Sequence, residues 1–253
     1  MNYTKQIRET RPIVHCITNP VTVNDCANIV LAMGASVTMA HHKEEVEEIT
    51  TGCNALVCNF GATDDFESIF LAVKRSNECH HPVIVDPVGI SGSTFRRKKL
   101  IELLETARVT CIRGNYSEIK ALLQDESGIS GVDAAEEDQQ EKDSLFEQMK
   151  VYALKKKVIL VASGKIDLVT DGKKSYALSG GNEIMSRITG TGCMSSAMLG
   201  AILAVDPSVE AVAWSCSYMK KTGEIAYEQT QKVQGGTMTF KEKLIDTISL
   251  DQL

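Results

Sequence analysis

The sequence predicts an α/β protein built on a mostly parallel central sheet that helices cover. Two observations lead to this prediction. Short apolar runs that end in turn residues alternate along the chain with longer segments of helical period, as in parallel strands joined by crossover helices. Asp171-Gly172 lies between two alternating runs, a strong signal for a tight hairpin, so an antiparallel edge is expected beside the parallel strands.

The predicted strands are short apolar runs with short connections. They span Ile13–Ile17, Ser36–Ala40, Ala55–Asn59, Val83–Asp86, Val109–Ile112 and Val158–Ala162. The segments between them have helical spacing, and the predicted helices span Val23–Met33, Asp64–Cys79, Arg96–Ala107 and Leu145–Lys156. The chain from Thr191 onward is expected to be mostly helical. Residues 133–143 are crowded with acids and are expected to form a solvated loop and a helix start.

Length and composition limit the class of protein. With 253 residues, 43% hydrophobic and 24% charged, the chain is typical of a globular protein, and residues 1–253 are predicted to form a single domain. The net charge of -6 argues against binding to nucleic acid or to an anionic membrane surface. The first residues lack a signal-peptide core and no apolar run is long enough to span a bilayer, so we expect a cytoplasmic protein.

Eight cysteines are spread along the chain without a CxxC pair. Most lie in apolar runs, so all except Cys193 are expected to be buried free thiols in a reducing compartment. The adjacent Cys79, His80 and His81 could suggest a metal site. Because no second ligand pair has the spacing of a structural zinc site, a solvated helix end is the preferred interpretation.

Three segments concentrate polar chemistry. Ligands of open α/β sheets bind at the carboxyl ends of the strands, so the loops there are the places to look for a site. DPVGISGST follows the fourth predicted strand, RGNYSE follows the fifth, and RITGTGC precedes a long helix rich in small residues. If the protein binds phosphate, these segments must supply the local charge that the acidic chain lacks overall.

Gly190, Thr191 and Gly192 can wrap their backbone N–H groups around an anion, because glycine allows left-handed angles and close approach. The helix that begins here adds the partial positive charge of its unpaired N–H groups. The segment therefore predicts an anion hole for a phosphate in transfer. A simple turn before a helix is the alternative, since glycines are common there.

Three charged residues complete a predicted phosphoryl-transfer site. Asp86 and Glu118 carry hard oxygen donors suited to Mg²⁺, and the planar fork of Arg113 suits a triphosphate. Phosphoryl transfer needs charge neutralisation and in-line positioning more than covalent chemistry. An ordinary surface ion pair or a helix cap is the alternative for each residue, and Glu118 lies in an early helical turn where any acid helps.

The motifs HCITNPVTVNDCAN, KEEV, DPVG, RGNYSEI, GVDA, DLVTDG and ITGTGC occur in the order of one known family, from about His15 to the C-terminal helices. By these motifs the chain resembles the hydroxyethylthiazole kinase family of the ribokinase-like superfamily. The resemblance implies a ribokinase-like fold, with helices on both faces of the sheet and an antiparallel edge hairpin. It also implies phosphorylation of the hydroxyl of 4-methyl-5-(2-hydroxyethyl)thiazole by ATP, in thiamin biosynthesis or salvage.

The resemblance also implies where the substrates bind. The thiazole would lie against Asn19, Val21, Met39 and Gly190, with its hydroxyethyl arm aimed at the anion hole. The family assembles as a homotrimer with sites between subunits, so Met39 would meet a substrate held mainly by a neighbouring chain.

For the nucleotide, the resemblance implies ATP contacts from Arg113 and Ser163. Asn115 and Glu118, together with Asp86, would organise Mg²⁺ and the phosphates.

Cys193 takes the position at which most ribokinase-like enzymes carry an aspartate as the base for the substrate hydroxyl. A thiol at a helix N-terminus can ionise more readily than in water, and it can accept a proton or a hydrogen bond from the alcohol. It is not expected to be a covalent nucleophile, because the hydroxyl can attack the γ-phosphorus directly. The predicted catalytic set is therefore Cys193 with Gly190, Thr191 and Gly192.

Three alternatives stay open. The nearest is a kinase for another vitamin-precursor alcohol, such as hydroxymethylpyrimidine. A dinucleotide-dependent oxidoreductase is disfavoured, because no GxGxxG follows the first strand. A catalytically silent nucleotide-binding protein is disfavoured by the presence of Asp86, Arg113, Glu118 and the Gly190–Cys193 turn.

Overall fold

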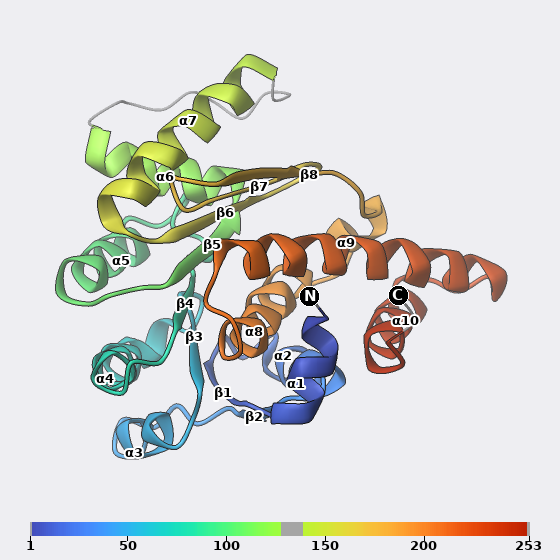
Figure 1. The fold of residues 1–253 in the computed structure, drawn as a ribbon, viewed down its shortest axis with the longest axis horizontal. Helices are drawn as coiled ribbons and strands as arrows, with labels where there is room; N and C mark the ends of the chain where they lie inside the picture. The colour runs from blue at the N-terminus through green and yellow to red at the C-terminus, as the bar shows by residue number, and fades with distance from the viewer. Residues whose placement is uncertain (1, 128–138, 252–253) are drawn as a thin grey trace.

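The computed structural model describes residues 2–127 and 139–251, and its strands form one eight-stranded sheet of order β2-β1-β3-β4-β5-β6-β7-β8 (Figure 1). The first six strands pair in parallel, and β7 and β8 add an antiparallel edge. The strands are β1 Ile13–Ile17, β2 Ser36–Thr38, β3 Ala55–Asn59, β4 Val83–Asp86, β5 Cys111–Asn115, β6 Ile159–Ser163, β7 Asp167–Thr170 and β8 Ser175–Leu178.

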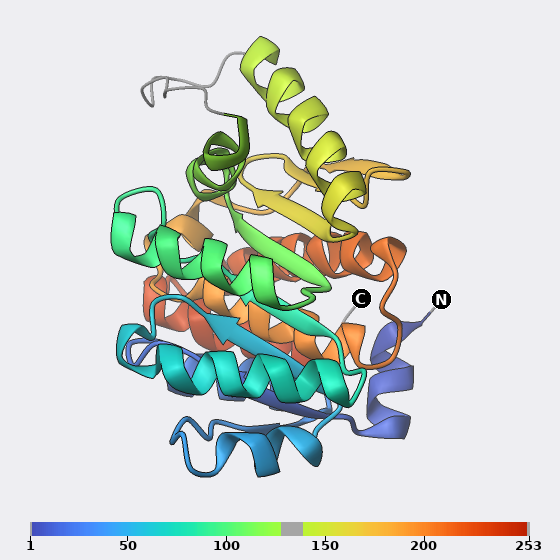
Figure 2. The same cartoon turned by 90° about the vertical axis from the view of Figure 1, so that its left-hand side faces the viewer.

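Helices cover both faces of this sheet (Figures 1 and 2), as the resemblance implied. One face carries α1 Tyr3–Thr10, α2 Val23–Ala32, α8 Thr191–Leu203, α9 Val209–Lys232 and α10 Thr237–Ser249. The other face carries α3 Val46–Thr51, α4 Phe66–Glu78, α5 Thr94–Thr106, α6 Tyr116–Ser127 and α7 Gln139–Lys156. Two short 3-10 helices, η1 Thr63–Asp65 and η2 Glu183–Arg187, complete the described elements.

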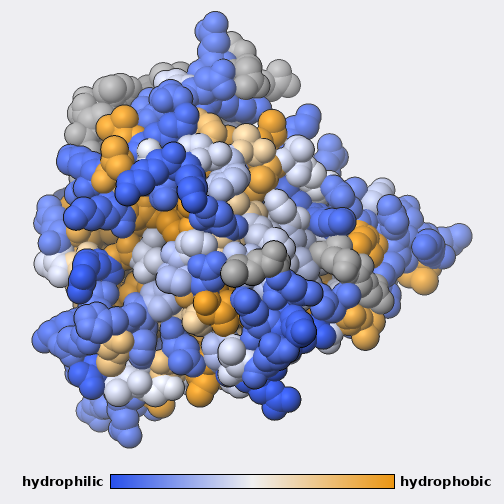
Figure 3. All heavy atoms as spheres, viewed as in Figure 1, coloured by the Kyte–Doolittle hydropathy of each residue, from blue (hydrophilic) through white to orange (hydrophobic). Residues whose placement is uncertain are grey.

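The inner strands are apolar along their whole length because both of their faces are buried. Side chains alternate between the faces, so Val14 and Val57 join the core under α8, whereas Leu56 and Cys58 join the core under α4. The outer surface is different. On the side of the molecule in Figure 3, hydrophilic residues cover most of the surface and apolar residues form smaller patches between them.

Helix α8 lies unusually close to the sheet. A Cβ at Gly200 would come within 2.7 Å of both Val14 Cγ1 and Val57 Cγ2. Nearly every residue of α8 from Met194 onward is buried, so this helix lies between the sheet and the outer helices. The contact fixes the position of the Gly190–Cys193 turn above the middle strands.

The predicted elements are largely confirmed. The bounds of β1, β3 and β4 agree with the prediction, and the expected hairpin forms, with the Asp171 carboxylate accepting the backbone N–H groups of Lys173 and Lys174 at 2.8 and 2.7 Å. Three long helices follow Thr191, as expected. The acidic segment 133–143 lies mostly outside the described residues, which resume at Gln139 within α7.

Several bounds were predicted wrongly. β5 runs to Asn115 rather than Ile112, because β6 pairs with it through Arg113, Gly114 and Asn115. β2 ends at Thr38 rather than Ala40. The short helices α1 and α3 were not predicted, and α7 begins six residues before Leu145.

All eight cysteines fall within the described residues and are free thiols; six are buried, and Cys79 and Cys193 are partly exposed. Cys79 therefore departs from the expected burial. Among residues 2–127 and 139–251, no helix combines the length and apolar character needed to cross a bilayer.

Candidate active site

The turn before α8 is set by the left-handed backbone of Gly190 at its N-cap. Gly190 adopts φ +95°, which other residues rarely adopt, and a Cβ there would make a tight contact of 3.0 Å with Thr22 Cγ2, so both features favour glycine. Thr191 opens the helix and its hydroxyl donates to the carbonyl of Met185 at 2.9 Å, which ties the turn to η2. The first N–H groups of α8 are left without helical partners and are available to an anion.

Two further loops meet at this turn, as the sequence predicted. Arg113 Nη1 donates to the carbonyl oxygen of Gly192 at 3.0 Å, which places the guanidinium at the first turn of α8. One turn further along the helix, Ser196 Oγ donates to Asp86 Oδ2 at 2.8 Å. The glycine turn, the end of β4 and the end of β5 therefore form one site.

Asp86 is a buried carboxylate whose neighbours only partly offset the loss of hydration. Burial raises its pKa to about 6, and the nearby charge of Glu118 acts in the same direction. Arg113 and hydrogen bonds from Ser196 and Asn59 act in the opposite direction without cancelling the effect of burial. A further cation near Asp86 would favour its ionised form.

Asn115 and Glu118 form a reciprocal helix cap at the start of α6. Asn115 Oδ1 accepts the backbone N–H of Glu118 at 2.9 Å, and Glu118 Oε2 accepts the backbone N–H of Asn115 at 2.9 Å. The other oxygen, Oε1, accepts the backbone N–H of Gly89 at 2.9 Å. Glu118 therefore caps the start of α6, and its carboxylate also holds the loop that follows Asp86.

Two amide side chains surround the sulphur of Cys193. Asn59 Nδ2 donates to Sγ at 3.3 Å and Asn19 Nδ2 donates to it at 3.5 Å. Burial nevertheless raises the pKa of the thiol to about 11, and the neighbouring charge of Asp86 raises it as well. The direction of this shift runs against the expectation that the helix N-terminus would promote ionisation, because burial removes the thiolate from water.

The four residues expected around the thiazole are only partly gathered in one chain. Asn19 is buried beside Cys193, and its side-chain oxygen accepts the backbone N–H of Val21 at 3.1 Å. The Val21 side chain itself is 71% exposed. Met39 is partly buried and packs against the core beneath α2 and α8. A single chain therefore leaves Val21 uncovered.

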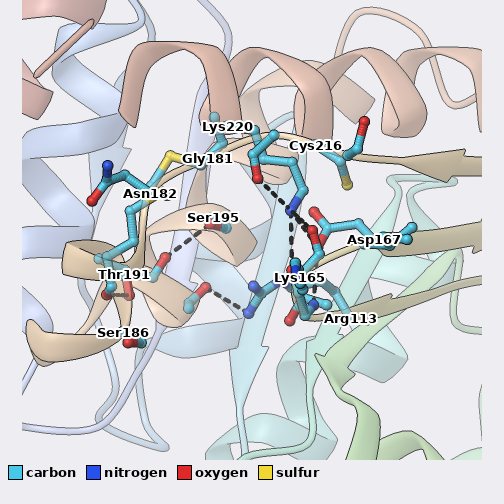
Figure 4. Close-up of a pocket in the computed structure, with 18 of the residues that line it drawn as sticks. Arg113, Lys165, Asp167, Gly181, Asn182, Ser186, Thr191, Ser195, Cys216 and Lys220 are labelled. Atoms are coloured by element: carbon cyan, nitrogen blue, oxygen red, sulfur yellow. Dashed lines mark hydrogen bonds and ion pairs between the residues drawn. The ribbon is translucent and has the colours of Figure 1, made fainter. Parts of the chain in front are cut away.

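A cavity of about 790 Å³ is lined in part by Thr191 and Gly192 of the glycine turn (Figure 4). Its lining includes four of the predicted residues: Arg113, Ser163, Thr191 and Gly192. Ser163 Oγ donates to the carbonyl of Gly114 at 3.1 Å, so its hydroxyl is held at the end of β6. Asp86, Asn115, Glu118, Cys193 and the four residues expected around the thiazole are not part of this lining.

Sequence reasoning missed Asn59, Ser196, Asp167 and Lys220. Asn59 ends β3 directly beside Asp86 in the parallel register, so the rule that located Asp86 could also have found it. Ser196 lies one helical turn after Gly192, and that spacing was a usable signal. Lys220 lies inside a long helix, and no local pattern distinguishes it from the lysines around it.

Comparisons of the sequence with family models and with known proteins point to one family. The model of the Hydroxyethylthiazole kinase family matches residues 4–252. A hydroxyethylthiazole kinase of Clostridium acetobutylicum is 42% identical and covers 96% of this chain and 92% of that protein. One of Methanobrevibacter smithii is 36% identical, covering 95% of this chain and 88% of that protein.

Solved structures agree. The hydroxyethylthiazole kinase protein of Pyrococcus horikoshii superposes with a TM-score of 0.87 at 34% identity, covering 98% of this chain and 91% of that chain. The ADP complex of Bacillus subtilis pyridoxal kinase shares the fold alone, with a TM-score of 0.61 at 17% identity over 82% of this chain and 89% of that chain. The chain belongs to the hydroxyethylthiazole kinase family.

Proposed function

We propose that the protein transfers the γ-phosphoryl group of ATP to the hydroxyl of 4-methyl-5-(2-hydroxyethyl)thiazole, yielding the thiazole phosphate for thiamin biosynthesis or salvage. One observation carries the proposal. Thr191 and Gly192 of the glycine turn line a cavity of about 790 Å³, and the next residue, Cys193, lies outside that lining with its sulphur beside Asn19. A triphosphate bound in the cavity could thus reach a turn that an alcohol approaches from the side of Cys193.

The nucleotide occupies the cavity. Its polar lining includes Arg113 and Ser163, which would contact the phosphates and the nucleotide. Backbone N–H groups of Thr191, Gly192 and Cys193 stabilise the charge on the phosphoryl oxygens during transfer, because they are already oriented and cost no reorganisation. The hydroxyl oxygen forms the new bond to the γ-phosphorus while the bond to the bridging oxygen breaks, and ADP leaves with that electron pair. The hydroxyl proton leaves late in the step, to an oxygen of the transferred phosphoryl group and then to water.

The residues around Asp86 suit a magnesium ion. The charge of Glu118 helps to raise the pKa of Asp86, so a divalent cation held by these carboxylates would favour the ionised form of Asp86. Within the described residues no group of three or more acidic, histidine or cysteine side chains could hold a metal, so further ligands would come from phosphate and water. When bound, Mg²⁺ would neutralise charge on the transferring phosphates.

Cys193 orients the alcohol. Because its pKa is about 11, the thiol is protonated near neutral pH and does not act as a preformed base. Its sulphur can accept a hydrogen bond from the hydroxyl, and Asn19 and Asn59 hold the sulphur in place. In a loose transition state the alcohol keeps its proton until late, so this orientation is compatible with the chemistry.

The exposed Val21 and the partly buried Met39 support a thiazole site completed by a neighbouring chain. We propose a homotrimer in which neighbouring chains share each thiazole site. The roles of Asn115 and of the other site residues are part of the same proposal. The single domain and the cytoplasmic location stay predictions.

A phosphorylation assay tests the function. The purified protein is given ATP and Mg²⁺ with either the thiazole alcohol or hydroxymethylpyrimidine, and the phosphorylated products are quantified by mass spectrometry. We expect the thiazole phosphate to form with a specificity constant at least tenfold above that for the pyrimidine. Preference for the pyrimidine would favour the neighbouring activity, and ATP binding without phosphorylation of either alcohol would favour a catalytically silent protein.

A further inference from the structure

A buried lysine lies in the wall of the cavity (Figure 4). Lys220 belongs to α9, and its side chain is only 9% exposed. Its Nζ lies 3.0 Å from the carbonyl oxygen of Gly164, 3.3 Å from those of Lys165 and Gly180, and 3.2 Å from Asp167 Oδ1. An ammonium has three N–H donors, and these four oxygens surround it closely enough for every donor to have an acceptor. We call this set of oxygens the cage around Lys220.

The oxygens of this cage come from two separate segments of the cavity wall. Gly164 and Lys165 belong to the turn between β6 and β7, and Asp167 begins β7. Asp167 Oδ1 also accepts the N–H of Gly164 at 3.0 Å. Gly180 belongs to the segment that leaves β8 towards η2. Both segments line the cavity, so the ammonium sets the distance between two parts of its wall.

Glu224, one turn after Lys220 on α9, contacts the neighbouring residue of the same cavity wall, Gly181. Its Oε1 accepts the N–H of Gly181 at 2.8 Å. The Gly180 carbonyl and the Gly181 N–H are the two ends of one peptide unit, so Lys220 and Glu224 together fix the orientation of that unit. Gly180 and Gly181 have φ values of +113° and +84°, which other residues rarely adopt.

Stability alone is a weak reason for such a cage. A buried ion pair often contributes little net stability compared with apolar side chains of similar size, because both charges must be desolvated. Here the cation instead satisfies the backbone carbonyls of Gly164, Lys165 and Gly180. The arrangement gives a fixed shape to a polar, glycine-rich wall beside the glycine turn.

We propose that Lys220 is a positioning residue of the nucleotide site, with its ammonium bracing the 164–167 segment against the Gly180-Gly181 peptide. The inference rests on the proposed function, in that it takes the nucleotide to occupy this cavity. Glu224 acts as the secondary brace. Loss of the ammonium leaves the walls free to separate and weakens nucleotide binding more than it affects the chemical step.

Direct binding measurements test the inference. ADP affinity is measured by calorimetry for the wild type, Lys220→Met and the matched control Lys221→Met, which changes an exposed lysine on the same helix. We expect Lys220→Met to weaken ADP binding by about tenfold, equivalent to about 1.4 kcal/mol, and Lys221→Met to leave it unchanged. In steady-state assays the KM for ATP should rise, while kcat and the KM for the thiazole alcohol change by less than about threefold.

A chemical rescue distinguishes the ammonium from general packing. Lys220→Ala should recover ADP affinity when propylammonium is added, because this ion replaces the missing methylenes and charge, whereas neutral propanol should not restore it. If Lys220→Met does not fold, ADP affinity is measured for Glu224→Gln instead. This variant is expected to weaken ADP binding about threefold.

The possible failures are separable. ADP affinity unchanged in a folded Lys220→Met, or in Glu224→Gln where the lysine variant does not fold, overturns the inference and leaves the proposed function intact. Equal rescue by propanol also overturns it. Absence of ADP binding by the wild type overturns both proposals. Thiazole phosphorylation can fail while ADP still binds, and the inference is then judged on ADP affinity alone.

Discussion

Asn59 Nδ2 lies 3.3 Å from the sulphur of Cys193, so an amide at the end of β3 holds the side chain that faces the proposed alcohol. Asn59 Oδ1 in turn accepts Asn19 Nδ2 at 3.2 Å and the backbone N–H of Gly61 at 2.8 Å. These two hydrogen bonds to Oδ1 fix the orientation of the Asn59 amide and therefore the direction of its Nδ2 towards the thiol. The position of the sulphur depends on this network as much as on α8.

The first prediction concerns Asn59. Asn59→Ala should lower kcat by about tenfold, the scale of one lost hydrogen bond of about 1.4 kcal/mol, with little change in the KM for ATP. A double-mutant cycle with Cys193→Ala provides the control, and Asn59→Ala should cost less than about threefold in that background. Additive losses would show that Asn59 acts independently of the thiol.

The second prediction concerns Cys193 itself. Cys193→Asp should retain or increase turnover, because a carboxylate accepts the alcohol proton more readily than a thiol with a pKa of about 11. The same change should lower the melting temperature, since it places a second carboxylate near the buried Asp86. Turnover and thermal unfolding are measured on the same preparation. Complete loss of activity in a folded variant contradicts the role proposed for this position.

The third prediction concerns Arg113. Arg113→Ala should raise the KM for ATP by about tenfold or more, because a charge-assisted contact to the phosphates is worth roughly 1.5–3 kcal/mol. Arg113→Lys keeps a point charge without the planar fork and should lie between the alanine variant and the wild type. Steady-state kinetics with ATP varied provide the measurement. Unchanged ATP kinetics in Arg113→Ala would place the nucleotide elsewhere.

The fourth prediction links pH to stability through His15. This fully buried residue of β1 contacts Thr50 Oγ1 through Nδ1 at 2.9 Å and the Ala40 carbonyl through Nε2 at 2.8 Å. Burial lowers its pKa, while the Ala40 carbonyl and the charge of Glu45 act in the opposite direction. The unfolded chain therefore takes up the proton more readily than the folded protein, and stability is lost as the pH falls below about 6.5.

Denaturant unfolding at pH 7 and pH 5 tests this linkage. The free energy of unfolding should fall more between these two values in the wild type than in His15→Gln, because only the wild type carries the buried imidazole. Equal decreases in both proteins would assign the pH dependence to other groups.

The sequence was most informative where one signal dominated. The bounds of β3 and β4 followed from uninterrupted apolar runs, and the hairpin followed from Asp171-Gly172. The end of β5 could not be predicted, because Arg113 and Asn115 are polar and remain in the strand only through their pairing with β6. Glu118 was left as either a metal ligand or a cap, and the cap could be recognised only once Gly89 and Asn115 were located around it.

In the site, too, some features could be predicted from the sequence and others depended on the tertiary fold. The nearness of Asp86 and Arg113 was predictable, because they lie towards the carboxyl ends of the neighbouring parallel strands β4 and β5. The raised pKa of the Cys193 thiol was not predictable, since it depends on how deeply the turn is buried. The cage around Lys220 depends on backbone carbonyls, whose directions are set by the tertiary fold and leave no mark in the sequence.

The close fit of α8 against β1, β3 and β4 also bears on synthesis of the chain. These strands are complete by Asp86, whereas α8 begins only at Thr191. During translation the valines that receive Gly200 stay uncovered until more than one hundred further residues have been made. A ribosome that stops before α8 would release a half-covered sheet, prone to aggregate and lacking the Gly190–Cys193 turn.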